Sequence, residues 1–354
     1  MSKGSVPMEV QKILNEYDLS KLSVATAGSH SALQILHGAK KEGLRTVLIV
    51  KKDRLDFYRT FSHFIDEFII IENWSEILEK DVKDNLIALN SIIIPHGSFV
   101  EYVGSKNLQK YEVPIFGSRK ILEWEATQEK KMELLRRAGI RVPKEFKSPE
   151  EVDRLVIVKL GGAKGGRGYF LASTPEEVKE GLEKLGNPSN YIIQEYVIGV
   201  PAYYHVFNSK VYNRIEITGM DIRYESNVDG LRRLPPKYAS KVSPTFTVVG
   251  NIPMVLRESL LITVYNYAKS FVEVTKEVVG EEIVGPFCLE SIITENGEIV
   301  VFEFSGRIVA GTNVYIDGSP YSYLYWDEPM SVGRRIAREI RKARDKGMLE
   351  EILR

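Results

Sequence analysis

Cysteine is almost absent from this sequence, since Cys288 is the single one among 354 residues. One cysteine can form neither an intramolecular disulfide nor a metal site built from several cysteines. Long apolar runs are absent too, because none approaches the roughly 20 residues that a membrane-spanning helix needs. The N-terminal segment is polar and lacks the apolar stretch of a secretory signal. We therefore expect a soluble, cytoplasmic protein.

An excess of either charge is also missing, because 48 Lys and Arg residues balance 48 Asp and Glu residues. Proteins that coat nucleic acid or bind anionic membranes normally carry excess positive charge, so we expect neither partner. A zero sum still allows a local basic pocket. The hydrophobic share of 44% is that of an ordinary globular chain. At roughly 150 residues per domain, the length predicts two or three domains.

The first third of the chain alternates β-prone runs with helical spacing. We predict strands at residues 22–27, 46–50, 68–71 and 91–95, with a helix after the first of them. Strands separated by helices imply βαβ units and a parallel sheet, whose ligands lie beyond the carboxyl ends of the strands. Two loops follow strand ends there, at 28–31 and 95–98, and each contains a His, a Ser and a Gly.

A glycine-rich loop at 161–168 lies between predicted strands at 155–159 and 169–171. Its glycines let the backbone approach a ligand and direct N–H groups at phosphate oxygens. Lys164, Arg167 and the preceding Lys159 add positive charge. The spacing is neither a Walker A motif nor a dinucleotide-binding fingerprint. A flexible hairpin turn is the alternative interpretation.

The last third contains a predicted hairpin with arms at 287–294 and 298–305, joined through Asn296-Gly297. Glu290 and Glu303 are placed almost symmetrically about the turn, which would bring them close together across the hairpin. Neighbouring carboxylates repel unless they are protonated or bridged by a cation, and Mg²⁺ prefers such oxygen ligands. A solvated strand face is the alternative, although both glutamates interrupt apolar runs, where unpaired charge is costly.

These motifs, in this order, resemble the ATP-grasp superfamily. The matching elements are Lys159, the loop at 161–168, a strand end at 194–197 that would form the nucleotide hinge, and the glutamate pair followed by Arg307. The resemblance implies an α/β and α+β protein with a Rossmann-like N-terminal parallel-sheet domain at 1–117. A small lid subdomain at 118–200 and a large subdomain with the metal site at 201–354 would follow. The superfamily usually has Asn two residues after the second metal Glu, where this chain has Ser305.

The resemblance also implies a set of ligand contacts. Mg²⁺ or Mn²⁺ would lie on Glu290 and Glu303, and the catalytic cations would be Lys159, Lys164 and Arg307. Arg223 could contact a phosphate. ATP would be bound by residues of the loop, the hinge and one further strand: Lys159, Lys164, Gly165, Gly166, Gly168, Gln194, Glu195, Tyr196, Val197 and Glu216.

A narrower resemblance covers nearly the full chain. Segments 29–36, 97–104, 223–230, 250–261, 285–290 and 307–313 are similar to the archaeal formate-dependent 5-formaminoimidazole-4-carboxamide ribonucleotide synthetases of purine biosynthesis. In that family, the residues that match His30, Ser98 and Asn251 contact 5-aminoimidazole-4-carboxamide ribonucleotide (AICAR). One departure precedes the glycine-rich loop, where the family often has Pro-His-Gly and this chain has Leu160-Gly161-Gly162.

This resemblance implies an ATP-dependent carbon–nitrogen ligase. ATP would phosphorylate formate to formyl phosphate, and the 5-amino group of AICAR would attack the formyl carbon to give the formamido product FAICAR, ADP and phosphate. The chain would bind only these small molecules and further copies of itself, as a homo-oligomer. A paralogous ligase with another carboxylate or amine acceptor stays open. So does a non-catalytic nucleotide-binding regulator, which is expected to lose the metal ligands that this chain keeps.

Overall fold

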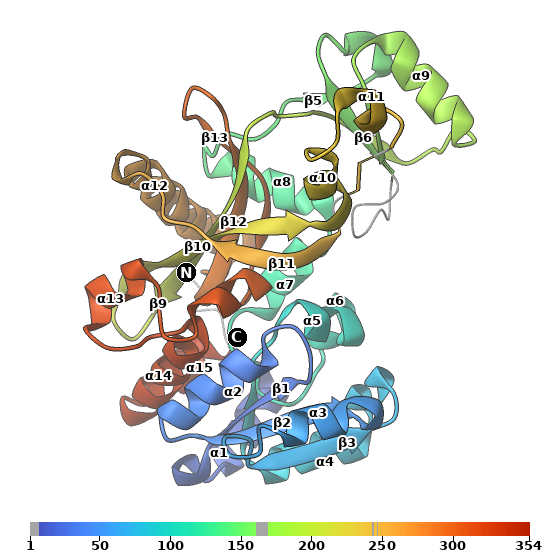
Figure 1. Ribbon diagram of the computed structural model, residues 1–354. Helices are drawn as coiled ribbons and strands as arrows, with labels where there is room; N and C mark the ends of the chain where they lie inside the picture. Colours follow the sequence, from blue (N-terminus) through green and yellow to red (C-terminus); the bar gives the residue numbers. More distant parts are fainter. Residues whose placement is uncertain (1–6, 161–168, 243, 246) are drawn as a thin grey trace.

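The structure, a computed structural model, describes residues 7–160, 169–242, 244–245 and 247–354, arranged around three sheets (Figure 1). The glycine-rich loop, with Lys164, Gly165, Gly166 and Gly168, lies outside the described residues. Figure 1 shows the first sheet at the bottom, the largest sheet in the middle and the smallest at the top. No helix in the described ranges is long and apolar enough to cross a membrane.

The first sheet is parallel, as the alternating pattern predicts, with strand order β3-β2-β1-β4. Its apolar runs are strands because both faces are covered, and all five residues of β1 are buried. The strands are β1 (Ser23–Ala27), β2 (Arg45–Lys51), β3 (Glu67–Ile71) and β4 (Ser91–Ile93). The helices of this part are α1 (Met8–Glu16), α2 (Ala32–Lys41), α3 (Leu55–Arg59), α4 (Lys80–Ala88), α5 (Gly97–Val103) and α6 (Ser105–Leu108).

The smallest sheet is antiparallel, in the order β5-β8-β6-β7. Its strands are β5 (Glu145–Phe146), β6 (Val156–Leu160), β7 (Tyr169–Ala172) and β8 (Tyr191–Glu195). Helix α9 (Pro175–Lys184) begins where Thr174 accepts a hydrogen bond from the Glu177 amide and a proline fills the first turn. Helices α7 (Arg119–Glu125) and α8 (Gln128–Arg137) precede this sheet.

The largest sheet is antiparallel, in the order β11-β10-β9-β12-β13. Its strands are β9 (Val200–Ser209), β10 (Arg214–Glu225), β11 (Val248–Pro253), β12 (Gly285–Ile293) and β13 (Ile299–Ser305). The predicted hairpin is confirmed as β12–β13, and Glu290 pairs with Glu303 in the register. The longest helix of the described residues is α12 (Glu258–Val274), followed by a π-helical turn, Thr275–Val279. The remaining helices are α10 (Ser226–Leu231), α11 (Pro236–Ala239), α13 (Pro320–Trp326), α14 (Val332–Asp345) and α15 (Leu349–Ile352).

The C-terminal helix α14 packs against α2 of the first part, almost 300 residues away in the chain. The two backbones approach so closely that a Cβ on Gly38 would lie 2.2 Å from the Arg334 nitrogen. Glu42 anchors the contact through ion pairs with Arg334, Arg338 and Arg341. The end of the chain therefore shares one hydrophobic core with the first sheet.

Candidate active site

One face of the largest sheet gathers polar side chains, and we call it the polar face. Residues opposite each other in neighbouring strands share a face of the sheet. The register sets Asp221 beside Tyr203, Tyr203 beside Glu290 and Glu290 beside Glu303, in one row across four strands. On the same face, Arg223 and Asn251 form the next row on one side of this row. The row on its other side contains His205, Cys288 and Ser305. The charges that interrupt these apolar runs therefore gather on one face of the sheet.

The two glutamates of the polar face differ in their surroundings. Glu290 is 2% exposed, accepts a hydrogen bond from the Ser305 hydroxyl at 3.0 Å and pairs with Arg223 at 2.9 Å. Glu303 is partly exposed and pairs with Lys131 of α8. Ser305, at the position where the superfamily usually has Asn, thus contacts Glu290, the first of the two candidate metal ligands. Sequence reasoning missed Lys131, because a lysine on an amphipathic helix looks like any solvated cation.

The carboxylate of Glu303 is ready to bind a cation. Burial acts to raise its pKa, but the charges of Lys131, Arg223 and Lys159 outweigh burial and lower the pKa below its ordinary value. Ionised carboxylate oxygens fit Mg²⁺, which usually completes its octahedron with water and phosphate oxygens. Among the described residues there is no cluster of three or more His, Cys, Asp or Glu that could hold a metal alone. The pair therefore suits a metal that arrives with a nucleotide.

Lys159 and the hinge lie on the small sheet beside this face. The Lys159 ammonium donates to the Gln194 side chain at 2.9 Å, and burial lowers its pKa. Glu195 is directed elsewhere, since its carboxylate accepts from the Lys144 amide and pairs with Arg154. The amides of Glu195 and Tyr196 already donate to the carbonyls of Lys144 and Leu155. An adenine contact at the hinge would have to use other groups.

The expectation that Glu216 contacts the nucleotide does not fit the structure. Its carboxylate is fully buried near the start of β10, where Arg335 binds it at 2.9 and 3.1 Å and Arg214 at 2.7 Å. Glu225, at the other end of the same strand, instead lies close enough to the hinge for its charge to raise the pKa of Tyr196, after the larger effect of burial. The fold, and not the sequence, shows that Glu225 and Glu216 lie at opposite ends of this strand.

The two loops after β1 and β4 bring their histidines together. The His30 and His96 rings stack with centroids 5.1 Å apart. His96 is buried; its Nδ1 accepts from the Phe99 amide at 3.2 Å, so its proton lies on Nε2, which contacts the Ala27 carbonyl at 2.9 Å. His96 therefore has a positioning role, supporting the His30 ring and capping α5. Ser98 lies beside Ser29, with hydroxyls 3.2 Å apart.

His30 is held neutral in this setting. Burial first, then the charges of His96, Arg307 and Arg223, lower its pKa to about 2. Its Nδ1 contacts the Ser31 hydroxyl at 2.7 Å. The backbone adopts a left-handed conformation there, with φ of 54°, which places the side chain at the mouth of the loop. A neutral imidazole is available for hydrogen bonding to a ligand.

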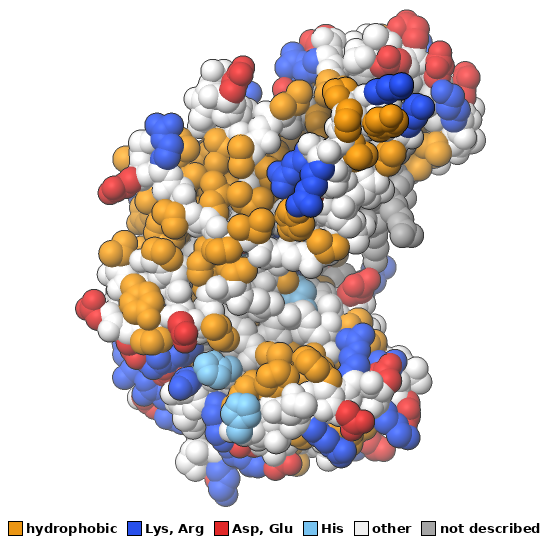
Figure 2. Space-filling view, in the orientation of Figure 1, with side chains coloured by type: hydrophobic (Ala, Val, Ile, Leu, Met, Phe, Trp, Pro, Cys, Tyr) orange, Lys and Arg blue, Asp and Glu red, His pale blue; other side chains and the backbone are white. Residues whose placement is uncertain are grey.

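Arg307 connects the histidine loops with the polar face. A Cβ on Gly97 would lie 3.1 Å from His30 Nε2 and 3.3 Å from the Arg307 guanidinium, so the two side chains meet over this glycine. Arg307 is oriented by Glu125 of α7, 3.0 Å away. Glu125 is a second residue that the sequence did not single out. Figure 2 shows the corresponding hollow on the right of the molecule, between the first sheet below and the small sheet above.

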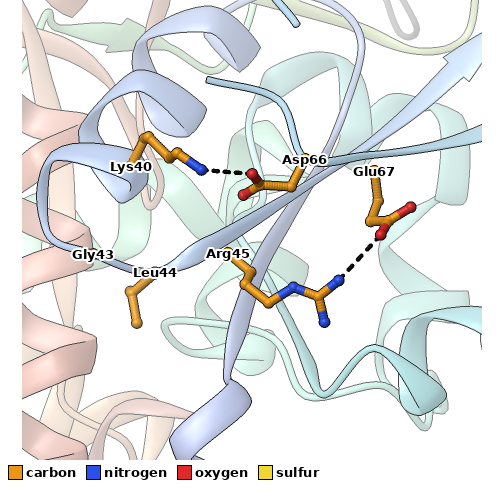
Figure 3. A pocket seen from close by; sticks show the side chains of 6 residues that line it. All are labelled: Lys40, Gly43, Leu44, Arg45, Asp66 and Glu67. Carbon is orange, nitrogen blue, oxygen red and sulfur yellow. Dashed lines mark hydrogen bonds and ion pairs between the residues drawn. The ribbon is translucent and has the colours of Figure 1, made fainter. Parts of the chain in front are cut away.

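A separate hollow lies at the edge of the first sheet and is shown in Figure 3. It is lined by Lys40, Gly43, Leu44, Arg45, Asp66 and Glu67. Both of its cations are already paired, Lys40 with Asp66 and Arg45 with Glu67, as the dashed lines mark. With its charges satisfied internally, it carries no catalytic arrangement.

A Rossmann-like parallel sheet, a small antiparallel sheet and a larger sheet with two facing glutamates together define the ATP-grasp class. The fold agrees with solved relatives: an ADP complex of an N5-carboxyaminoimidazole ribonucleotide synthetase matches 90% of this chain and 76% of its own, with a TM-score of 0.64 at 15% identity. Two family models also match, a protein of unknown function (DUF1246) at residues 24–146 and a domain of unknown function (DUF1297) at 170–354.

Proteins with higher sequence identity to this chain identify its family within the ATP-grasp class. A 5-formaminoimidazole-4-carboxamide-1-(beta)-D-ribofuranosyl 5'-monophosphate synthetase from Ignicoccus hospitalis is 76% identical over 98% of this chain and 100% of its own length. The crystal structure of an IMP biosynthesis protein, PurP, from Thermococcus kodakaraensis is 35% identical, covers 93% of this chain and 99% of its own, and has a TM-score of 0.75. This chain belongs to the family of these synthetases.

Proposed function

We propose that this protein is an ATP- and formate-dependent ligase that converts AICAR to FAICAR through formyl phosphate, with release of ADP and phosphate. The observation that carries the proposal is the meeting of two sets of residues. Glu290, Glu303 and Arg223 occupy the polar face. Arg307 meets His30 over Gly97, and its charge also acts on Cys288 of the polar face. The first set suits a nucleotide with its metal, and the second suits an acceptor held by the first sheet.

The chemistry requires activation of formate, because oxide is a poor leaving group whereas phosphate can leave. Transfer of the γ-phosphoryl group to a formate oxygen forms the mixed anhydride. The amine of AICAR then attacks its carbon, and the C–O bond to phosphate breaks. The catalytic task is positioning and charge neutralisation, so this route needs no covalent nucleophile. Mg²⁺ or Mn²⁺ on Glu290 and Glu303 would supply neutralisation of the phosphate charge when bound.

The chain's own cations have distinct places in this proposal. Lys159, buried beside Gln194, would bind a nucleotide phosphate, as would Lys164 of the loop. Arg307 would bind the phosphoryl group in transfer, because it meets His30 over Gly97 and its charge reaches Cys288 on the polar face. Preorganised cations in a partly dry site stabilise developing charge without the reorganisation that water would require. His30, Ser98 and Asn251 would hold the ribonucleotide.

We also assign Glu225 to the nucleotide ribose, in place of Glu216. Exchange of Glu225 for Gln should raise KM for ATP about tenfold, because a charged hydrogen bond to a hydroxyl is lost, and KM for AICAR should stay unchanged. The matched variant, Glu216→Gln, removes a buried partner of Arg335 and should lower the melting temperature while the ratio of the two KM values stays at the wild-type value. A shift of the KM ratio in Glu216→Gln but not in Glu225→Gln would contradict this assignment.

A homo-oligomer is part of the proposal, and the occupant we assign to the exposed apolar face is a second copy of this chain. Large apolar side chains gather over β11, α12 and α13, in the left and middle of Figure 2. The most exposed are Leu324 (83%), Ile262 (68%), Val255 (64%) and Val249 (62%). Such patches usually mark interfaces, and β11 is the open edge of its sheet. We keep the cytoplasm as the location, since the substrates are soluble metabolites.

Light scattering checks this interface. The wild-type mass should be a multiple of the chain mass, and Leu324→Glu should lower it by placing a charge in the contact. Leu185→Glu, at an exposed apolar position on the small-sheet side, should leave the mass unchanged. A monomeric wild type would exclude the oligomer.

A paralogous ligase with another acceptor is the second candidate, and the departure at Leu160-Gly161-Gly162 favours it. Purified protein with ATP and Mg²⁺ decides between the two. Release of ADP that requires both formate and AICAR supports the first. Release only with a different acid or amine supports the second, and nucleotide binding without turnover would support a non-catalytic regulator.

A further inference from the structure

Asp221 is a buried carboxylate that the chemistry above does not use. It lies on β10 at 1% exposure, in the same row as Tyr203 and Glu290. One oxygen is 2.7 Å from His205 Nε2, and the other accepts from the Asn251 side-chain amide at 2.7 Å. His205 is itself 2% exposed. A chain of contacts thus runs from the interior of the sheet to Asn251.

The carboxylate fixes the orientation of both neighbours. Asn251 donates from its side-chain NH₂ group to one Asp221 oxygen, and His205 Nε2 lies against the other oxygen, so the nitrogen of the Asn251 amide is directed at Asp221. The oxygen of a planar amide lies on the side opposite this interaction. Asn251 is only partly buried, and its Oδ1 is therefore the atom left for a ligand. Without the Asp221 carboxylate, an asparagine could present either its amide oxygen or its NH₂ group to a ligand.

The backbone also holds Asp221 in place. A Cβ on Gly311 would lie 2.1 Å from one carboxylate oxygen and 2.7 Å from the other, so the turn Ala310–Tyr315 packs directly on the carboxylate. The carboxylate cannot rotate toward that turn. Its direction, and with it the direction of the Asn251 amide, is set before any ligand arrives.

We propose that Asp221 is a positioning residue that orients Asn251 so that its amide oxygen accepts a hydrogen bond from an N–H group of the ribonucleotide acceptor. This inference rests on the proposed function and adds the direction of one hydrogen bond to the substrate. At Asn251 the site selects a hydrogen-bond donor, such as the exocyclic amine or carboxamide of an aminoimidazole. A substrate with a carbonyl or ether oxygen at that place is disfavoured. Its oxygen and the Asn251 amide oxygen both accept hydrogen bonds, so they repel and each is left without a donor.

Steady-state kinetics with ATP, formate and AICAR test the proposal. In Asp221→Asn, the new side-chain amide can donate as well as accept a hydrogen bond. The Asn251 amide can then flip and present either its oxygen or its NH₂ group to the ligand. We expect KM for AICAR to rise about 10- to 100-fold, the usual effect of losing one buried hydrogen bond to a ligand, while KM for ATP stays within about twofold. Glu339→Gln removes another fully buried carboxylate, at Ser209 and Arg335. It should lower the melting temperature without changing the KM ratio.

A second variant covers the case in which Asp221→Asn fails to fold. Gly311→Ala keeps the carboxylate but forces it to move, and the same selective rise in KM for AICAR is expected. Unchanged KM for AICAR in either folded variant, or equal rises for AICAR and ATP, would overturn the positioning role. Absence of AICAR-dependent turnover in the wild type would instead overturn the proposed function, and the inference with it.

Discussion

Exchange of Glu303 for Gln is expected to lower kcat for ADP release by about 10²- to 10³-fold or more, the range seen when one electrostatic group of a catalytic site is removed. The reason is the loss of a charged oxygen ligand on the polar face, opposite Glu290. A neutral amide binds Mg²⁺ weakly, and Lys131 loses its partner. The concentration of Mg²⁺ that gives half-maximal rate should rise at the same time.

The hairpin itself offers a matched control for this variant. Glu298, near the turn, pairs with Arg141 and is half exposed, so Glu298→Gln should keep the wild-type rate and metal dependence. Both variants should remain folded, which the melting temperature shows. Wild-type turnover in Glu303→Gln would remove the metal role from the glutamate pair.

The second large effect is expected at the histidine loops. His30→Ala should raise KM for AICAR about 10- to 100-fold, through loss of a hydrogen bond and of ring packing, while KM for ATP stays within about twofold. The expected selectivity follows from position, because His30 belongs to a loop of the first sheet, where it stacks on His96 and meets Arg307, whereas the predicted hinge belongs to the small sheet. Equal losses for both substrates would refute the assignment of His30 to the acceptor.

The pH dependence separates His30 from an ordinary surface histidine. With a pKa of about 2, it stays neutral in the folded protein, so its protonation should not limit the rate between about pH 5 and 8. The unfolded chain takes up this proton below the ordinary value of about 6.5, so His30 contributes a loss of stability as pH falls below that value. His30→Ala should remove this contribution, and His37→Ala, at a partly buried position on α2, should leave KM for AICAR unchanged.

Local sequence signals predicted the parts of the site that depend on short-range geometry. The Asn-Gly signal predicted the β12–β13 hairpin. Next to the turn Ile293 pairs with Ile299, and a β-bulge between Glu290 and Ser291 then brings Glu290 opposite Glu303. Apolar runs predicted the parallel sheet, and its strand ends located His30 and Ser98 in neighbouring loops. The partner residues are brought together within one hairpin, where the bulge completes the pairing, or at the shared edge of one sheet.

Contacts between distant elements were not predictable in the same way. Lys131 and Glu125 orient Glu303 and Arg307 from helices that read as ordinary charged surfaces. Helix α14, rich in charged residues, buries Arg335 against Glu216, which is why Glu216 is unavailable to a nucleotide. A charge on an amphipathic helix looks solvated until its partner, more than 100 residues away, is known.

In the proposed reaction, formate is activated as formyl phosphate before the amine attacks. Turnover of ¹⁸O-labelled formate with ATP and AICAR tests it most directly, with the inorganic phosphate analysed by mass spectrometry. We expect one ¹⁸O atom in each phosphate released, because the formate oxygen bound to phosphorus leaves with it, and one in the formyl group of the product. Phosphate that carries no ¹⁸O, although FAICAR forms from labelled formate, would contradict the account.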